Sequence, residues 1–314
     1  MTQVVVLDDY QHVAAESADW SAIDSEVRFV HEHVVGDELV DVLAEATVAV
    51  AMRERTPFDA ALLARLPRLR LLVTTGGANA SIDVAAAARH GVTVCGTRSL
   101  PSPAAEMTWA LLLALVRQVP RSDRDVREGR WQTTMGDDLA GRTLGVVGLG
   151  RLGRRVARVA LAFDMEVLAW SQNLDPDAAR AQGVQPTDKD DLLTRADVVS
   201  LHLRLSDRTR GVIGVRELDL MKPTAYLVNT SRGPLVDETA LIGALSSGAI
   251  AGAGLDVYDE EPLPPGHPLL TAPRTVLSPH LGYVTTGGYA VFYGDAVDDV
   301  VAWQAGAPVR VIGP

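Results

Sequence analysis

One stretch of the chain, residues 143–163, joins a short apolar run to a glycine-rich turn and then to an amphipathic pattern. The run TLGVV is rich in β-branched residues and is typical of a strand buried on both faces. The turn reads GLGRLG, and after it Val156, Val159, Ala160 and Phe163 recur at helical spacing. Strand, glycine turn and helix follow one another in the order that dinucleotide binding requires.

The three glycines of this turn have different tasks in such a site. Gly148 permits the tight turn, Gly150 lets the backbone approach a pyrophosphate, and Gly153 lets the helix pack closely on the strand. The helix N-terminus offers unpaired N–H groups and a positive dipole end to the phosphates. A plain structural turn is the alternative, which the flanking strand and helix disfavour. No Gly-Lys-Ser/Thr follows the turn, which excludes a P-loop.

The composition narrows the class of protein. The chain has 314 residues, enough for two domains, and a net charge of −11, which argues against nucleic acid or an anionic membrane surface as a partner. The N-terminus lacks the basic region of a signal peptide. The longest apolar helical run, residues 107–116, is far shorter than the ~20 residues that span a bilayer. The lone cysteine, Cys95, excludes a disulfide within the chain. We therefore expect a cytoplasmic protein without a membrane partner.

Strand-like and helical patterns alternate along both halves of the chain, which predicts parallel, doubly wound sheets. In the first hundred residues the expected strands are 4–7, 27–30, 48–52, 69–74 and 92–95. From residue 143 onward a six-stranded sheet is expected, with later strands at 167–170, 198–203, 226–229, 251–257 and 275–277. The first half contains no G-x-G-x-x-G, so we expect the cofactor in the second half.

Three polar clusters lie at the ends of strands of the second half, at residues 228–233, at 254–257 together with 259–262, and at 277–282. Ligands of open parallel sheets bind at the carboxyl ends of the strands. Beside a nicotinamide, Arg232 can hold a substrate carboxylate and polarise its carbonyl group, while His280 exchanges a proton and Glu261 orients the imidazole. Taken singly, each residue has an ordinary structural alternative. Their shared position favours carbonyl–alcohol interconversion.

At this point the sequence resembles the D-isomer-specific 2-hydroxyacid dehydrogenases over nearly its whole length. The segments GVVGLGRLGRRVA, VSLHLRLSDRTRGVI, MKPTAYLVNTSRGPLVDETAL and SPHLGY resemble that family's signatures. The resemblance implies an α/β protein of two doubly wound parallel-sheet domains. A Rossmann dinucleotide-binding domain, residues 99–284, would be inserted into a flavodoxin-like substrate domain formed by residues 1–98 and 285–314. It also implies a homodimer that pairs through residues 104–129 and the arm after them.

The resemblance further assigns roles to single positions. Arg232, Glu261 and His280 match the catalytic residues, and Asp256 matches the aspartate that holds the nicotinamide carboxamide. A loop at residues 74–83 matches the loop whose backbone N–H groups bind the substrate carboxylate. This match points to Gly76, Gly77 and Ala78 as substrate-binding residues. Arg53 is added because it follows a strand of the first half, where it would face the cleft; a surface salt bridge is an equal alternative for it. The positions expected to bind the dinucleotide are Gly148, Gly150, Arg151, Leu152, Gly153, Ser171, Leu203, Thr209, Thr230, Ser231, Arg232, Asp256, His280 and Gly282.

The chain departs from the family pattern at three of its positions. Arg204 replaces a usual proline and places an extra charge near the cofactor, and Ala78 replaces a usual glycine. Ser171 stands where NAD-preferring members carry an aspartate, so we expect use of NAD or NADP with a mild lean to NADP. His202, inside the second signature, is expected to have a structural role. No metal site is expected.

These patterns together predict an NAD(P)-dependent D-2-hydroxyacid dehydrogenase. Its expected substrate is a small 2-oxo acid such as glyoxylate, hydroxypyruvate or pyruvate. Two alternatives remain open at this point: a phosphite-type dehydrogenase of the same architecture, which also needs an anion-binding arginine, and a dinucleotide-sensing corepressor of the same fold.

Overall fold

The computed structural model describes residues 2–313, which divide into two compact units. The first unit comprises the chain up to Leu100 together with the segment from Val284 onward, and the second is Pro101–Tyr283. The sequence-based boundaries, after residues 98 and 284, differ from these by two residues and by one residue. Within residues 2–313 no helix has the length and apolar character needed to cross a membrane.

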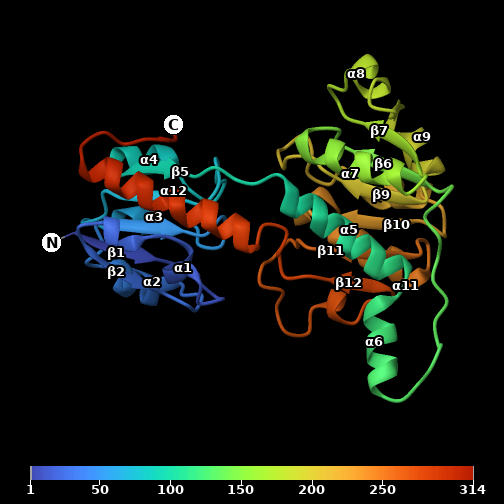
Figure 1. The fold of residues 1–314 in the computed structure, drawn as a ribbon, viewed down its shortest axis with the longest axis horizontal. Helices are drawn as coiled ribbons and strands as arrows, with labels where there is room; N and C mark the ends of the chain where they lie inside the picture. The colour runs from blue at the N-terminus through green and yellow to red at the C-terminus, as the bar shows by residue number, and fades with distance from the viewer. Residues whose placement is uncertain (1, 314) are drawn as a thin grey trace. The chain divides into compact units, whose positions relative to one another are not determined.

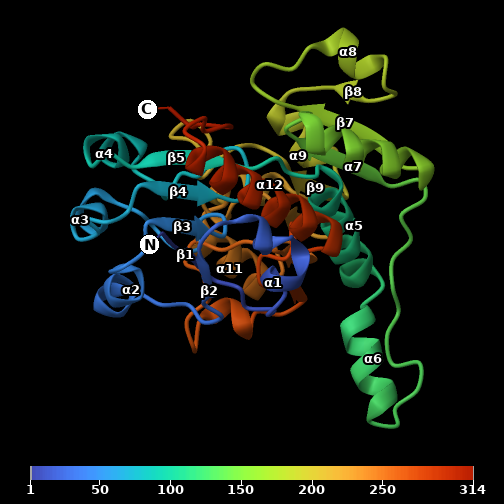
Figure 2. The same ribbon diagram turned by 60° about the vertical axis from the view of Figure 1, so that its left-hand side comes forward.

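The first unit is built on a five-stranded parallel sheet of order β2-β1-β3-β4-β5. Its central strands are buried on both faces, which explains why they read as continuous apolar runs. Figure 2 shows α2, α3 and α4 along one side of this sheet and α1 and α12 along the other. The strands are β1 (Gln3–Val6), β2 (Glu26–Phe29), β3 (Val48–Ala51), β4 (Leu71–Thr74) and β5 (Thr93–Gly96). The helices are α1 (Ala14–Ser17), α2 (Gly36–Leu43), α3 (Ala60–Ala64), α4 (Val84–Arg89) and α12 (Thr286–Gln304), with a short 3₁₀ turn at Trp20–Ala22.

The second unit contains a seven-stranded parallel sheet of order β12-β11-β10-β9-β6-β7-β8. The strands are β6 (Thr143–Val147), β7 (Glu166–Trp170), β8 (Gln185–Pro186), β9 (Val198–Leu201), β10 (Tyr226–Asn229), β11 (Gly252–Leu255) and β12 (Thr275–Leu277). The order reverses between β6 and β9, and such a switch point is where doubly wound sheets bind ligands. The predicted fold class is confirmed, and the expected count of six strands misses only β8.

Helices cover both faces of the second sheet. They are α5 (Ser102–Val116), α6 (Val119–Arg127), α7 (Arg151–Ala162), α8 (Pro176–Arg180), α9 (Lys189–Arg195), α10 (Val215–Leu220) and α11 (Glu238–Ser247), with 3₁₀ turns at Gly233–Leu235 and Pro268–Leu270. Helix α5 packs on α7 and β11, which accounts for its apolar residues all round. Figure 1 shows α6 and the segment after it projecting from the rest of this unit.

Candidate active site

The glycine turn joins β6 to α7. Gly148 has a φ of +104°, and a Cβ there would lie 2.8 Å from the carbonyl group of His202. A Cβ on Gly153 would lie 2.1 Å from the carbonyl oxygen of Gly148, so α7 packs directly on the turn. Gly150, the N-cap of α7, has no atom within 4 Å of its Cβ position, and no side chain caps the helix. The first N–H groups of α7 therefore remain available to an anion.

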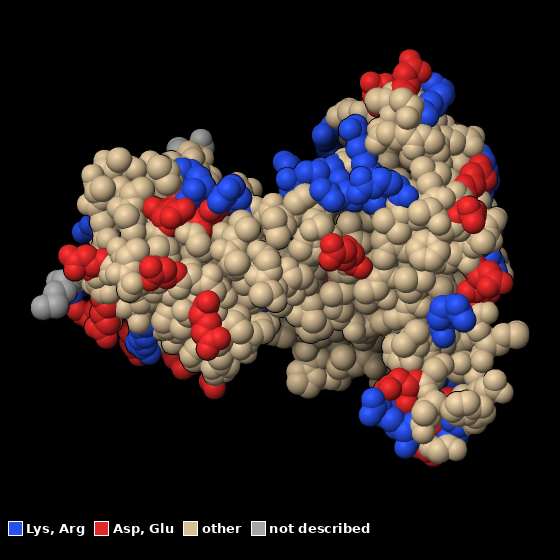
Figure 3. Space-filling model, in the orientation of Figure 1, with Lys and Arg blue, Asp and Glu red and all other residues tan. Residues whose placement is uncertain are grey.

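Helix α7 also carries a concentration of positive charge. Arg151, Arg154 and Arg158 are exposed and Arg155 is half-buried, and Figure 3 shows Lys and Arg side chains gathered on the surface over this helix. Within residues 2–313, none of these four arginines forms an ion pair with an acidic side chain. Because the charge is not neutralised locally, it adds to the positive end of the helix dipole and favours a polyanionic ligand.

The predicted catalytic histidine and glutamate lie in direct contact. His280 Nδ1 is 2.6 Å from Glu261 Oε2, and the other carboxylate oxygen accepts a hydrogen bond from the N–H of Tyr258 at 2.9 Å. This contact orients the imidazole ring and engages Nδ1, so Nε2 is the ring nitrogen that the carboxylate does not contact. His280 itself has a φ of +54°, a left-handed conformation that is uncommon for histidine.

Asp256 holds the loop that contains His280. The carboxylate is buried and accepts three hydrogen bonds, from Ser278 Oγ at 2.6 Å, Leu281 N at 2.8 Å and Gly282 N at 2.7 Å. Burial raises the pKa of Asp256, and these donors oppose the rise. A Cβ on Gly282 would lie 2.8 Å from Asp256 Oδ2, so only glycine lets the loop approach this closely. The left-handed conformation of His280 is thus fixed by groups on both sides of it.

Arg232 lies in the segment that follows β10. Its carbonyl oxygen accepts a hydrogen bond from Asn229 Nδ2 at 2.9 Å, and Asn229 Oδ1 accepts one from Ser231 N at 3.1 Å. Ser231 Oγ donates to the carbonyl of Leu201 at 3.0 Å, which ties the segment to the neighbouring strand β9. Since β10 pairs with β11 and β11 with β12, the segments holding Arg232, Asp256 and His280 all leave the same edge of the sheet.

The first unit contains the loop expected to bind a carboxylate, which follows β4. The N–H of Gly76 already donates to Thr97 Oγ1 at 2.7 Å. By contrast, the N–H groups of Gly77 and Ala78 make no hydrogen bond to any part of the chain that the structure describes, and both residues are exposed. Of the three expected donors, the structure therefore leaves two available to a ligand.

Arg53 lies against this same loop. A Cβ on Gly76 would lie 2.0 Å from Arg53 Nη1, and the Arg53 N–H donates to Thr75 Oγ1 at 2.9 Å. Arg53 also pairs with Glu54, but both side chains are largely buried. The alternative of an exposed surface salt bridge therefore does not describe this pair. The structure brings the Arg53 guanidinium and Gly76 together, and contact of Arg53 with a substrate stays a prediction.

Comparison with known proteins decides the family. A sequence model described as "D-isomer specific 2-hydroxyacid dehydrogenase, NAD binding domain" matches residues 109–282, more than half of the chain. The chain belongs to this family. It is therefore a D-2-hydroxyacid dehydrogenase that binds a nicotinamide dinucleotide, and the resemblance seen in the sequence is confirmed.

The dehydrogenase is similar in sequence and in structure to several named proteins. A glyoxylate reductase of Aeropyrum pernix is 41% identical over 258 residues, which cover 79% of this chain and 77% of the relative. A D-3-phosphoglycerate dehydrogenase of Archaeoglobus fulgidus is 36% identical over 83% of this chain, but the match spans only 50% of that protein. A crystal structure of phosphoglycerate oxidoreductase from Vibrio cholerae O395 superposes with a TM-score of 0.93 at 37% identity, covering 98% of this chain and 100% of that one.

Two other predicted cofactor positions of the dehydrogenase, Ser171 and Leu203, lie beside the glycine turn. Ser171 directly follows β7, and Leu203, close to Gly148, follows β9. Thr230 Oγ1 is hydrogen-bonded to Thr108 Oγ1 at 2.7 Å. Thr209 Oγ1 donates to the carbonyl of Arg204 and accepts from Ser206 N, so it stabilises its own loop.

Some functional groups were missed by the sequence analysis. Asn229 holds the backbone of Arg232 in place. The Ser278 hydroxyl and the N–H groups of Leu281 and Gly282 hold the Asp256 carboxylate. Asn79 Nδ2 donates hydrogen bonds to Thr74 Oγ1 and to the carbonyl of Arg53. Asparagines and serines are common in turns, so their positions alone gave no signal. Burial lowers the pKa of His202 to about 4, which keeps the ring neutral and supports a structural role through Ser200 Oγ at 2.9 Å. No group of three or more potential metal ligands occurs among residues 2–313.

Proposed function

We propose that the dehydrogenase reduces a small 2-oxo acid of the glyoxylate, hydroxypyruvate or pyruvate type to the D-2-hydroxy acid. The observation that supports this most directly is the His280–Glu261 pair at 2.6 Å, which leaves Nε2 of an oriented imidazole for proton exchange. The Aeropyrum relative at 41% identity is named glyoxylate reductase, which favours a small substrate. The name of the Archaeoglobus relative adds a phosphorylated three-carbon acid as a candidate.

In the proposed mechanism, protein groups hold the substrate and move one proton. Gly77 and Ala78 donate their N–H groups to the substrate carboxylate, and Arg53 adds positive charge beside that loop. Arg232 binds the carboxylate and polarises the adjacent carbonyl group. His280 Nε2 donates a proton to the carbonyl oxygen as hydride reaches the carbonyl carbon, and takes it back in the reverse direction. Glu261 stabilises the positive charge that His280 holds before it donates.

The residues present fit a dinucleotide. The space beside Gly150 would be filled by any side chain, and the uncapped N–H groups of α7 suit a pyrophosphate. Gly148, Gly150, Arg151, Leu152 and Gly153 would hold it. When bound, the nicotinamide supplies the hydride for reduction and accepts it for oxidation. The proposed roles of Leu203, Thr230, Ser231, Asp256 and Gly282 are to line the same site.

We further propose that both NADH and NADPH are used, with a mild lean to NADPH. Residue 171 is a serine, followed by Gln172 and Asn173, so no carboxylate directly after β7 repels a 2′-phosphate. Arg204 is exposed in the loop after β9 and adds positive charge near the cofactor. The absence of an arginine directly after Ser171 argues against strict NADPH selectivity.

A second copy of the chain is the partner that we propose. The helix α6 and the arm after it expose large apolar side chains, including Trp131 at 75% and Met135 at 89% of their full area. Exposed apolar groups of this size on a projecting segment are typical of an interface. Because α6 and the segment after it project from the second unit, they would pack against a partner subunit.

The experiment that tests the function is a substrate panel run with each cofactor. Glyoxylate, hydroxypyruvate, pyruvate and 3-phosphohydroxypyruvate are tested for reduction, and phosphite for oxidation, by following the reduced nicotinamide. We expect turnover of the small 2-oxo acids and, from hydroxypyruvate, a product of D configuration. Oxidation of phosphite without reduction of any 2-oxo acid would refute the proposal, as would L product.

A further inference from the structure

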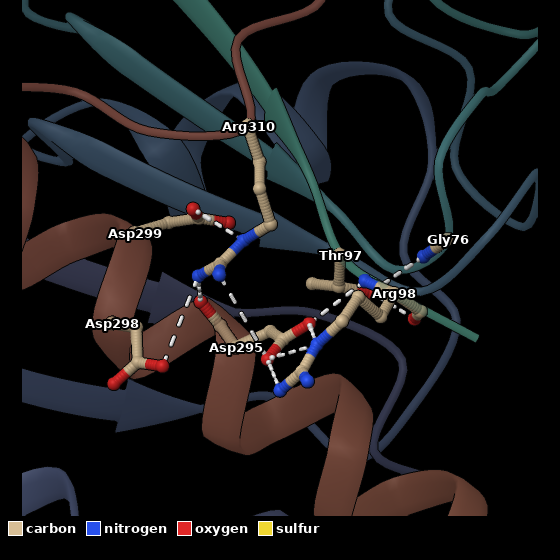
Figure 4. A network of polar contacts seen from close by, with 7 residues as sticks. All are labelled: Gly76, Thr97, Arg98, Asp295, Asp298, Asp299 and Arg310. Carbon is tan, nitrogen blue, oxygen red and sulfur yellow. Dashed lines mark hydrogen bonds and ion pairs between the residues drawn. The ribbon is translucent and has the colours of Figure 1, made fainter. Parts of the chain in front are cut away.

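The first unit contains a network of charged residues that the proposed mechanism does not use. It connects the carboxylate-binding loop to the last helix and to the C-terminal segment (Figure 4). The N–H of Gly76 donates to Thr97 Oγ1 at 2.7 Å, and the N–H of Thr97 is 3.1 Å from the carbonyl oxygen of Gly76. The start of the loop is thus bonded in both directions to the segment that follows β5.

That segment is itself held between the loop and the C-terminal residues. A Cβ on Gly96 would lie 2.7 Å from the Gly76 carbonyl oxygen and 2.9 Å from Ile312 Cδ1. Gly96 N donates to the carbonyl of Arg310 at 3.0 Å, and Ile312 N donates to Val94 O at 2.8 Å. Since β5 is at the edge of its sheet, the C-terminal segment covers the unpaired side of this strand. Because Gly96 lies between Ile312 and Gly76, a displacement of the C-terminal segment would also displace Gly76.

Two arginines fasten this arrangement to α12. Arg98 donates to the Asp295 carboxylate from its backbone N–H at 2.8 Å, from Nε at 3.0 Å and from Nη2 at 2.7 Å. Arg310 donates from Nε to Asp299 Oδ1 at 3.0 Å and from Nη2 to the backbone carbonyl of Asp295 at 2.7 Å. Both aspartates are buried. The forked pair of Arg98 with the Asp295 carboxylate fixes geometry as well as energy.

We propose that Asp295, Arg98 and Arg310 are positioning residues for the substrate carboxylate. They hold the segment after β5, and this segment holds Gly76, so that the next two N–H groups, of Gly77 and Ala78, keep the spacing that a carboxylate needs. The inference rests on the proposed role of those two N–H groups. It makes α12 and the C-terminal segment part of the substrate-binding machinery, although neither contributes a group that touches the substrate.

This role predicts an effect on substrate binding that a purely structural ion pair would not have. A misplacement of about 1 Å at binding groups can reduce rates on the order of a hundredfold. Every 2-oxo acid has the same carboxylate, so loosening the loop raises KM for all of them by a similar factor. The KM for the nicotinamide cofactor stays the same, because the cofactor does not bind this loop.

The test compares Asp295→Asn and Arg98→Ala with a matched control. Asp295→Asn removes the carboxylate charge within the same shape. Arg98→Ala removes a side chain that is 74% exposed, so this second variant is expected to fold and keeps the test valid if Asp295→Asn is unstable. The control, Asp37→Asn, breaks the Arg65–Asp37 pair on the surface of the same unit, where Asp37 is 90% exposed. Wild-type and variant enzymes are measured with glyoxylate and pyruvate at saturating cofactor, and with varied cofactor at saturating 2-oxo acid.

We expect Asp295→Asn to raise the KM of both 2-oxo acids about tenfold or more, Arg98→Ala to raise it less, and Asp37→Asn to change nothing. The KM for cofactor should stay within about twofold. Arg98→Lys, which keeps the charge but not the fork, should recover part of the loss. Unchanged KM values in folded Asp295→Asn and Arg98→Ala enzymes would overturn the inference, as would a KM rise for cofactor equal to that for 2-oxo acid. If the wild type reduces no 2-oxo acid, the proposed function fails instead.

Discussion

The glycine turn allows a quantitative prediction about cofactor binding. In Gly153→Ala, the added Cβ would lie 2.1 Å from the carbonyl oxygen of Gly148 and 3.1 Å from Val146 Cγ1. A carbon and a carbonyl oxygen in close contact are normally about 3.3 Å apart. The N-terminus of α7 must therefore move by about 1 Å relative to β6, because the atom in the way is backbone and cannot rotate aside.

This movement weakens the binding of a pyrophosphate by a calculable amount. A hydrogen bond of about 2.9 Å that lengthens by about 1 Å is lost, and each hydrogen bond to a charged group contributes about 1.5–3 kcal/mol. If two N–H groups of the turn and α7 bind the pyrophosphate, about 3–6 kcal/mol is lost. That loss raises the Kd for NADH or NADPH by a factor on the order of a hundred to ten thousand. Titration of the intrinsic or nicotinamide fluorescence measures it directly.

Two other glycines provide controls. Gly150→Ala has nothing within 4 Å of its Cβ, so the fold should keep its thermal midpoint while the methyl group blocks the pyrophosphate and cofactor binding falls. Gly243→Ala, on an exposed position of α11 with the same open surroundings, should leave cofactor binding unchanged and stabilise the helix by about 0.5–1 kcal/mol. A Gly153→Ala enzyme that binds NADH with the wild-type Kd would refute the reasoning.

Three further predictions test separate parts of the molecule. Arg232→Ala should raise KM for the 2-oxo acid and lower kcat, with partial recovery in Arg232→Lys, which lacks the bidentate fork; a normal kcat/KM would remove Arg232 from the site. Ser171→Asp should shift the ratio of kcat/KM values toward NADH by about tenfold, which corresponds to ~1.4 kcal/mol; a wild type that already requires NADH and is unaffected would place Ser171 away from the ribose. Burial raises the pKa of Asp299 to about 7. The folded state therefore binds the proton of the Asp299 carboxyl group more tightly than the unfolded chain does, and the free energy of unfolding falls as pH rises from about 4 to about 7. Asp299→Asn does not titrate, and its stability relative to wild type should rise across that window by on the order of 4 kcal/mol; parallel unfolding curves of the two proteins would contradict the assignment.

The fold was predictable because its strands are buried on both faces. Runs such as VAVA and LLVT are typical of strands covered by helices on either side, and each is followed by a helical pattern. The strand β8 escaped detection because its two residues, Gln185 and Pro186, are too few to show a period and one of them is a proline. The same reasoning placed His280 and Glu261 at one sheet edge, and the structure brings them to 2.6 Å.

The groups that hold the site residues in place were less predictable. Asp256 was expected to contact the nicotinamide, but two of its three hydrogen bonds to the His280 loop come from the backbone N–H groups of Leu281 and Gly282. Backbone donors leave no mark on the sequence. The engagement of Gly76 by Thr97 likewise depends on how β4 and β5 end side by side, which a pattern of apolar residues does not specify.

The network around α12 shows what a sequence can still indicate about such contacts. Asp295 and Asp299 are four residues apart, so they lie on one helix face, and this face also contains the buried residues Phe292 and Ala296. A carboxylate on the apolar face of a helix is buried when the protein folds, and a buried charge needs a partner of opposite sign. The sequence therefore requires a cation for each aspartate. It does not reveal which one, because Arg98 lies 197 residues from Asp295 in the sequence and only the folded first unit brings them together. The clustering of two aspartates on an apolar helix face thus predicts a long-range ion pair, whereas the identity of the arginines, and with it the link to Gly76, follows only from the fold.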